Sequence, residues 1–234
     1  MALAAAAILA ALGIAYLLTR PAPRLPLPIE IVRRIAALYL AVFKNFRVIH
    51  GEFIPDTGPL ILVANHTAVY DPVCLQVACR HRMIRFMEAR EYYKVWGLEA
   101  VYRMFRVIPV NRTGNDTAGI RAALRELSNN GCIGIFPEGK ISDDGQIHEA
   151  RKGVALLALL SNAVVVPGYF RGTRPFSGMV RDFLTFNHVT LQFGPPIRFD
   201  DLAEGHRDPE CRELALNRIM EAIRKLQEQV GSLN

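Results

Sequence analysis

The sequence contains few cysteines and lacks several motifs by which enzymes and nucleic-acid-binding proteins are often recognised. Four cysteines in 234 residues are too sparse for a disulfide-rich mini-protein and fit the reduced residues of a cytosolic domain. No Cys-x2-Cys or His-x3-His spacing indicates a metal site, so we expect no metal. A Gly-x-Ser-x-Gly nucleophile elbow and known nucleic-acid-binding motifs are also absent. We therefore expect no nucleophilic serine of this type and no nucleic-acid partner.

The chain does contain a large apolar fraction and an excess of positive charge. Hydrophobic residues make up 51% of the chain, which is enough for one domain with a sizeable core and excludes a disordered chain. Lys and Arg number 28 against 22 Asp and Glu, a net charge of +6. This excess favours anionic partners such as phosphorylated substrates or acidic lipid headgroups.

Residues 1–18 form an uncharged apolar run. As a helix this run is roughly 27 Å long, slightly short of a bilayer core of about 30 Å, so we expect a hydrophobic helix that spans the bilayer or lies in it. No positive charge precedes the run, which argues against a cleaved signal peptide. The alternative is an Ala-rich helix buried in a soluble core. Basic residues follow the run and predict that the rest of the chain lies on the cytoplasmic face of a membrane. These residues are Arg20, Arg24, Arg33, Arg34, Lys44 and Arg47.

A Pro-rich linker at 21–28 separates this run from a second helical pattern at 29–46. Apolar residues recur there at helical spacing, with basic residues off the stripe. The apolar stripe consists of Ile31, Ile35, Leu38, Val42 and Phe46, and the basic residues are Arg33, Arg34 and Lys44. We expect an amphipathic helix in the headgroup layer with its cations toward anionic lipid. The alternative is a surface helix packed on the domain. Residues 1–46 are thus predicted to attach the protein to the membrane, and residues 47–234 to form the main folded domain.

From residue 47 onward, short apolar runs alternate with helical patterns. Strands are expected at 47–50, 60–64, 106–110, 132–136, 163–167 and 189–193, and helices at 72–79, 117–129, 151–160 and 209–230. Strand runs that are apolar throughout indicate a sheet covered on both faces. The predicted class is α/β, with a mixed, largely parallel sheet covered by helices.

Polar side chains gather in loops that follow three of these strands, where α/β sheets concentrate their chemistry. His66 and Asp71 follow the strand at 60–64, and Arg112 follows the strand at 106–110. The third loop follows the strand at 132–136 and carries Glu138 and Lys140. A simpler interpretation is that Asp71 caps a helix that begins with proline, and that His66 is an ordinary loop histidine.

In their order and spacing these segments resemble the glycerophospholipid acyltransferases, the family that includes 1-acylglycerol-3-phosphate acyltransferase. The family's Asn-His-x4-Asp hallmark matches Asn65, His66 and Asp71, and its second block, a hydrophobic strand ending in Arg, matches 105–112. The Phe-Pro-Glu-Gly block is intact at 136–139, and a Val-Val-Pro block stands at 165–167. The resemblance runs from about 47 to 200.

The resemblance implies an O-acyltransferase that moves a fatty acyl group from acyl-CoA or acyl-carrier protein to the free hydroxyl of a lysophospholipid. His66 would be the general base and Asp71 would orient it, as in a Ser-His-Asp triad whose nucleophile is here the substrate hydroxyl. Arg112, Glu138 and Gly139 would bind the glycerol phosphate. No cofactor is expected besides the thioester co-substrate.

One block departs from the family pattern, at two adjacent positions. Where phosphatidic-acid-forming members continue Gly-Thr-Arg-Ser, this chain has Gly139 followed by Lys140, Ile141 and Ser142. Lys140 is expected to supply the missing cation. The preferred acceptor is 1-acylglycerol 3-phosphate, with a headgroup-bearing lysophospholipid as the alternative. A non-catalytic lipid-binding membrane protein is the alternative from another class.

Overall fold

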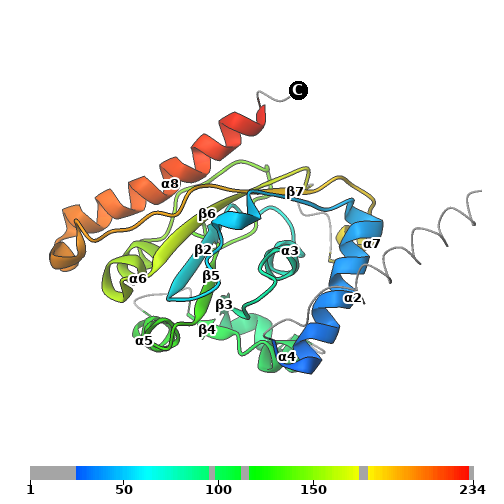
Figure 1. Ribbon diagram of the computed structural model, residues 1–234, viewed down its shortest axis with the longest axis horizontal. Coiled ribbons are helices and arrows are strands. Elements are labelled where there is room, and N and C mark those ends of the chain that lie inside the picture. The colour runs from blue at the N-terminus through cyan, green and yellow to red at the C-terminus, as the bar shows by residue number, and fades with distance from the viewer. Residues whose placement is uncertain (1–24, 95–97, 112–115, 174–178, 232–234) are drawn as a thin grey trace, which may run out of the picture.

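The computed structural model describes residues 25–94, 98–111, 116–173 and 179–231, and Figure 1 shows how their elements are arranged. The strands are β1 (Arg47–Ile49), β2 (Leu60–Ala64), β3 (Ile84–Ala89), β4 (Ile108–Val110), β5 (Cys132–Ile135), β6 (Val164–Arg171) and β7 (Thr190–Phe193). The α-helices are α2 (Leu27–Lys44), α3 (Asp71–Ala78), α4 (Leu98–Met104), α5 (Thr117–Ser128), α6 (Gly153–Ser161), α7 (Met179–Leu184) and α8 (Pro209–Gly231). Arg112 and the apolar run 1–18 lie outside the described residues.

The strands form one sheet of seven in the order β1-β7-β6-β2-β5-β3-β4. Strands β6, β2, β5, β3 and β4 run parallel to one another, whereas β7 is antiparallel to β6 and parallel to β1. The predicted mixed, largely parallel sheet is therefore confirmed. In the centre, Val63 of β2 pairs with Ile135 of β5 and with Pro167 of β6, so these three strands run side by side toward the same edge.

Helices cover both faces of the sheet, as the continuous apolar strands require. On one face, buried residues of α5, α6 and α8 pack on the odd-numbered positions of β2, such as Ile61 and Val63. On the other face, Leu60 and Leu62 pack with Leu40 of α2 and Leu75 of α3. The two helix layers lie on opposite sides of the sheet, with α8 far from α2 (Figure 1). Successive β2 side chains thus enter two separate cores.

Helix α2 packs on the domain through a different face from the predicted apolar stripe. Ile29, Leu40 and Lys44 are buried, whereas Ile31 and Ile35 are 50% and 64% exposed. The prediction that Lys44 points toward lipid headgroups is wrong, because this residue is fully buried. Its ammonium donates to the main-chain oxygens of residues 182 and 185 at 2.6 and 2.5 Å, and so ties α2 to the segment around α7.

Two other cations of α2 are bound by a neighbouring carboxylate. Arg33 and Arg34 both donate to Glu30, with Nε–O distances of 2.7 and 2.5 Å. Burial raises the pKa of Glu30, but the hydrogen bonds and charges of the two arginines outweigh it and leave the pKa below its ordinary value. None of the helices in the described part of the chain is long and apolar enough to cross a membrane.

Candidate active site

The site lies at the edge of the sheet toward which β2, β5 and β6 run side by side. The loop after β2 carries residues 65–70, the loop after β5 begins at Phe136, and residues 172–173 follow β6. Parallel pairing brings these loops together although they are about 70 to 100 residues apart in sequence. The tertiary structure therefore gathers the first and third sequence blocks and the residues that follow β6 at one place.

Asn65 continues the pairing of β2 with β6 beyond the last backbone pair. Its Nδ2 donates to the carbonyl oxygen of Phe170 at 3.2 Å, and its Oδ1 accepts from the N–H of Phe170 at 2.7 Å. An amide offers both a donor and an acceptor, so Asn is suited to replace a backbone group here. These two bonds hold the start of the loop that carries His66.

The imidazole of His66 is hydrogen-bonded to Asp71, with 3.0 Å between Nδ1 and Oδ2. Asp71 is fully buried, and His66 is 8% exposed, so only a small part of the ring reaches solvent. An ionised carboxylate can only accept hydrogen bonds, and this contact therefore places the imidazole proton on Nδ1. The lone pair then lies on Nε2, which is the arrangement that a general base needs.

Asp71 directs its carboxylate back into the loop and does not cap α3. The helix begins at Asp71 itself, and no side chain caps its first turn. Oδ2 of Asp71 accepts hydrogen bonds from the backbone N–H groups of Thr67 and Ala68, each at 2.8 Å. The interpretation of Asp71 as a helix cap is therefore wrong. The proline after it lies in the first turn of the helix, while the carboxylate holds the preceding loop and the imidazole.

Phe136 covers one face of the His66 imidazole, a contact that the sequence did not predict. The two ring centroids are 4.0 Å apart and the planes are inclined by 14°. Phe86 of β3 stacks on Phe136 at 6.2 Å. Gly134 leaves room for this stack, because a Cβ at that position would lie 2.5 Å from the Phe86 ring. His66 is thus held at its edge by Asp71 and on its face by Phe136.

Glu138 joins the loop after β5 to His66 through the backbone. Its Oε1 accepts from the N–H of His66 at 3.1 Å, and its Oε2 accepts from the N–H of His148 at 3.2 Å. Burial raises the pKa of Glu138, while the two N–H donors act in the opposite direction. A second bond, from the N–H of Ser142 to the carbonyl oxygen of His66 at 2.7 Å, completes the connection.

The other predicted site residues are placed as follows. Gly139 has a φ of +70°, a left-handed backbone conformation that favours glycine. Lys140 follows it and is exposed. The structure therefore brings His66, Asp71, Glu138, Gly139 and Lys140 to one edge of the sheet, while Arg112 lies outside the described residues.

A group of potential metal ligands occurs in the loop after β5. Ligand atoms of Asp143, Asp144 and His148 lie within 4.8 Å of one another. Oδ1 of Asp144 already accepts from the Ser142 hydroxyl and the Gln146 N–H, and lies 2.9 Å from Nε2 of His148. These bonds tie Asp144 and His148 into a hydrogen-bond network within the loop.

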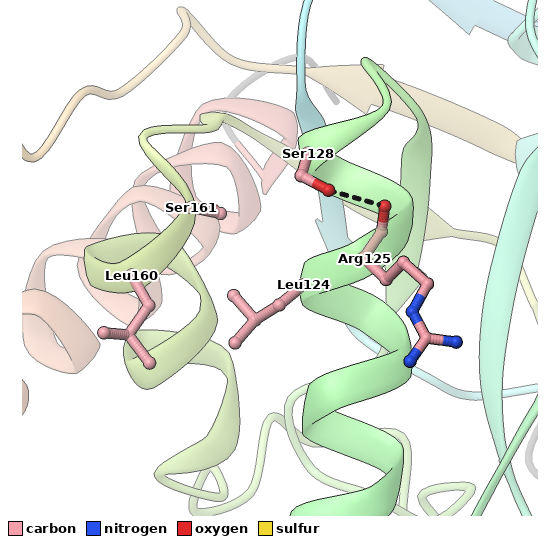
Figure 2. Close-up of a pocket in the computed structure, with 5 residues that line it drawn as sticks. All are labelled: Leu124, Arg125, Ser128, Leu160 and Ser161. Carbon is pink, nitrogen blue, oxygen red and sulfur yellow. Dashed lines mark hydrogen bonds between the residues drawn. The ribbon is translucent and has the colours of Figure 1, made fainter.

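A surface pocket of about 470 Å³ lies elsewhere, between the last turns of α5 and α6. It is lined by Leu124, Arg125, Ser128, Leu160 and Ser161 (Figure 2). The Ser128 hydroxyl donates to the carbonyl oxygen of Arg125 at 2.9 Å. Helices that connect parallel strands run back along the sheet, so their last turns lie at the edge opposite His66. The pocket is therefore separate from the site.

The fold and this geometry define a class of protein. It is an α/β domain in which a hydrogen-bonded histidine–aspartate pair, suited to general-base catalysis, lies at the carboxyl ends of parallel strands. A family model described as Acyltransferase matches residues 45–171, more than half of the chain. The chain belongs to this family and is an acyltransferase.

Individual relatives agree with this assignment. The chain is 22% identical over 196 residues to 1-acyl-sn-glycerol-3-phosphate acyltransferase of Bacillus subtilis strain 168, covering 83% of this chain and 94% of the relative. It is 25% identical over 151 residues to the human beta form, covering 63% of this chain and 54% of that protein. The crystal structure of the LPA acyltransferase PlsC from Thermotoga maritima has the same fold, with a TM-score of 0.65 at 22% identity, covering 85% of this chain and 79% of that one.

The first prediction concerns the histidine–aspartate pair. His66→Ala should lower kcat for acyl transfer by about 100- to 10,000-fold, because the hydroxyl loses its base. Asp71→Asn should also lower kcat severely with little change in acceptor KM, because the imidazolium loses its negative partner. Steady-state kinetics with circular dichroism as a folding control would check this. Near-normal turnover in either folded variant would contradict the role of that residue.

The second prediction concerns the aromatic face beside His66. Phe136→Leu should lower kcat by about 10- to 100-fold with little change in either KM, because the imidazole loses its flat support. Phe136→Tyr, which keeps the ring, should retain most of the activity. The upfield ring-current shift of the His66 ring protons in NMR spectra should disappear in the Leu variant and persist in the Tyr variant.

Phe193→Leu is the matched control for this test, because Phe193 is a fully buried phenylalanine in β7. It should lower the melting temperature and leave kcat nearly unchanged. If Phe136→Leu behaves in the same way, Phe136 only fills space.

Proposed function

We propose that this acyltransferase moves a fatty acyl group from a thioester donor, acyl-CoA or acyl-carrier protein, to the free hydroxyl of 1-acylglycerol 3-phosphate and so forms phosphatidic acid. The observation that carries the proposal is the His66–Asp71 pair, in which Nδ1 of the imidazole lies 3.0 Å from Oδ2 of the buried carboxylate. The names of the relatives in Bacillus subtilis and in humans support this acceptor.

The chemistry follows from the placement of the imidazole. Nε2 of His66 takes the hydroxyl proton as the substrate oxygen attacks the thioester carbonyl. Asp71 stabilises the imidazolium that forms. When the tetrahedral intermediate collapses, the carbon–sulfur bond breaks and His66 returns the proton to the leaving thiolate. The ester bond forms on the acceptor, and no residue of the enzyme is acylated.

Acceptor binding is assigned to Arg112, Glu138, Gly139 and Lys140, with the two cations at the phosphate. Glu138 accepts hydrogen bonds from the backbone N–H groups of His66 and His148. These bonds support a structural role for the carboxylate, which is to keep the turn that carries Lys140 beside His66. The left-handed backbone at Gly139 lets the chain turn there.

The third prediction tests substrate and cation together. Purified enzyme in detergent should convert labelled acyl-CoA and 1-acylglycerol 3-phosphate to phosphatidic acid. Lys140→Ala should raise the acceptor KM for this phosphomonoester by about 10-fold or more, and should affect a headgroup-bearing phosphodiester acceptor less because it carries less negative charge. The donor KM should stay nearly constant.

Other outcomes of this assay are informative. Faster transfer to a headgroup-bearing lysophospholipid would replace the proposed acceptor. No transfer to any acceptor would favour a non-catalytic lipid-binding protein. Equal effects of Lys140→Ala on both acceptors would reject its phosphate role.

We infer that the exposed side of α2 faces the membrane, with the catalytic domain on the cytoplasmic side. Ile31 and Ile35 are half-exposed or more, and Phe186, 66% exposed, stacks on Phe43 of α2 with 4.8 Å between ring centroids. Burying these exposed apolar side chains at the headgroup boundary lowers the free energy of the membrane-bound protein. Since Arg33 and Arg34 are bound to Glu30 and Lys44 is buried, apolar contact contributes more than cations here.

The fourth prediction tests this membrane face. Deleting residues 1–18 should release much of the protein from membranes, and α2 should hold the remainder on vesicles of phosphatidylglycerol and phosphatidylethanolamine. In the deletion variant, Ile31→Glu with Ile35→Glu should weaken vesicle co-sedimentation by at least about 10-fold, because two apolar side chains no longer enter the bilayer.

The matched control is Leu214→Glu, since Leu214 is a 45% exposed apolar residue of α8, which lies far from α2 (Figure 1). It should leave vesicle binding unchanged. If the two α2 substitutions also leave binding unchanged, this face of α2 does not contact the membrane.

A further inference from the structure

The side chain of Arg151 lies across the bare face of Gly139. A Cβ at Gly139 would stand 2.5 Å from Nε and 2.8 Å from Cδ of Arg151, so any larger residue there would displace the guanidinium. The left-handed conformation at Gly139 is one reason for a glycine at this position. The close approach of the arginine is a second, separate reason.

The backbone at Arg151 is anchored to the same turn. Its N–H donates to the carbonyl oxygen of Pro137 at 2.8 Å, shortly before α6 begins. Arg151 is therefore held at two points along the segment 137–139, through its main chain and through the packing of its side chain on glycine.

This turn is bonded directly to the base. Glu138, which lies between the two points that contact Arg151, accepts from the N–H of His66 at 3.1 Å. Ser142, three residues after Gly139, donates its N–H to the carbonyl oxygen of His66 at 2.7 Å. The Arg151 guanidinium thus packs on the same short segment that positions His66, at the edge where the acceptor hydroxyl must approach Nε2.

The chemistry of the group points to a phosphate. Arg151 is exposed, and a guanidinium offers a planar fork of donors that matches two phosphate oxygens at once. Lys140, also exposed on this turn, offers a point charge without the fork. Since the acceptor hydroxyl and its phosphate belong to one small glycerol unit, a cation packed on the turn that is hydrogen-bonded to His66 is placed to meet the phosphate while the hydroxyl reaches His66.

We propose that Arg151 is a binding residue for the phosphate of the acceptor, and that Gly139 is a glycine partly because this guanidinium crosses it. The proposal rests on the proposed function, since it takes a glycerol phosphate as the ligand of the site. Arg151, from the segment before α6, would thus join the acceptor-binding residues that were assigned from the loop after β5, and would add a guanidinium to them.

The test compares Arg151→Ala and Arg151→Lys with Lys152→Ala, which removes another exposed positive charge from the next residue. With 1-acylglycerol 3-phosphate as the acceptor, Arg151→Ala should raise the acceptor KM about 10- to 100-fold, with kcat and the donor KM nearly unchanged. Arg151→Lys should recover part of the loss, because it restores charge without the fork. Lys152→Ala should behave as the wild type.

A second measurement uses glycerol 3-phosphate as a soluble probe, with no acyl donor present. Its binding constant, measured by calorimetry on the full-length protein, should weaken in Arg151→Ala and remain unchanged in Lys152→Ala. If the wild type fails to acylate 1-acylglycerol 3-phosphate, the proposed function fails, while this binding measurement still tests Arg151.

Three results would overturn the proposal. The first is an unchanged acceptor KM in folded Arg151→Ala with an active wild type. The second is a rise in the donor KM alone, which would place Arg151 at the acyl-CoA. The third is an equal effect of Lys152→Ala, which would show a general effect of surface charge. If Arg151→Ala does not fold, Arg151→Lys is the deciding variant. An acceptor KM equal to that of the wild type would then reject the proposal that the guanidinium of Arg151 binds the phosphate.

Discussion

The parallel pairing of β2 with β5 is the constraint on which the site depends. Val63 lies beside Ile135 in the register, and each strand ends within one residue of that pair. The chain segments that follow both strands must therefore meet, which is why Phe136 reaches the imidazole of His66 although 70 residues separate them. A slip of one residue would turn Phe136 to the other face of the sheet and remove the contact.

Around His66, three different kinds of interaction act on three different parts of the residue. Asp71 holds one ring nitrogen, Phe136 covers one face of the ring, and Glu138 accepts from the backbone N–H. Each restricts a separate degree of freedom, so together they define where Nε2 points. Such restriction is useful in a base, because proton transfer requires a narrow range of distance and angle.

The helix α2 shows how one segment can belong both to the domain and to its outer surface. Lys44 is buried against main-chain oxygens from the segment around α7, and Leu40 enters the core that contains α3. Elsewhere on the helix, Ile31 and Ile35 are exposed. The helix therefore couples an apolar outer face to the packed interior, so that a membrane bound at this face would set the orientation of the catalytic edge.

Local sequence patterns were sufficient to predict the class of fold, the family and the central elements. Strand β2 matches its predicted bounds because five consecutive apolar residues are typical of a fully buried strand. The patterns did not predict β3, because Arg85 and Glu88 interrupt the apolar run in a strand that is only partly buried. The strand predicted from 106 begins at Ile108, because Arg106 adopts a left-handed φ of 48°.

For the site, the spacing of His66 and Asp71 was enough to predict a pair, because both lie in one short segment whose chemistry depends on residue type. Three other features came from the folded chain alone: Asp71 turns back into its loop, Phe136 stacks on the ring, and Arg151 crosses Gly139. Contacts between segments far apart in sequence depend on strand order and register. Local patterns of hydrophobicity constrain these only weakly, since many pairings bury the same apolar residues.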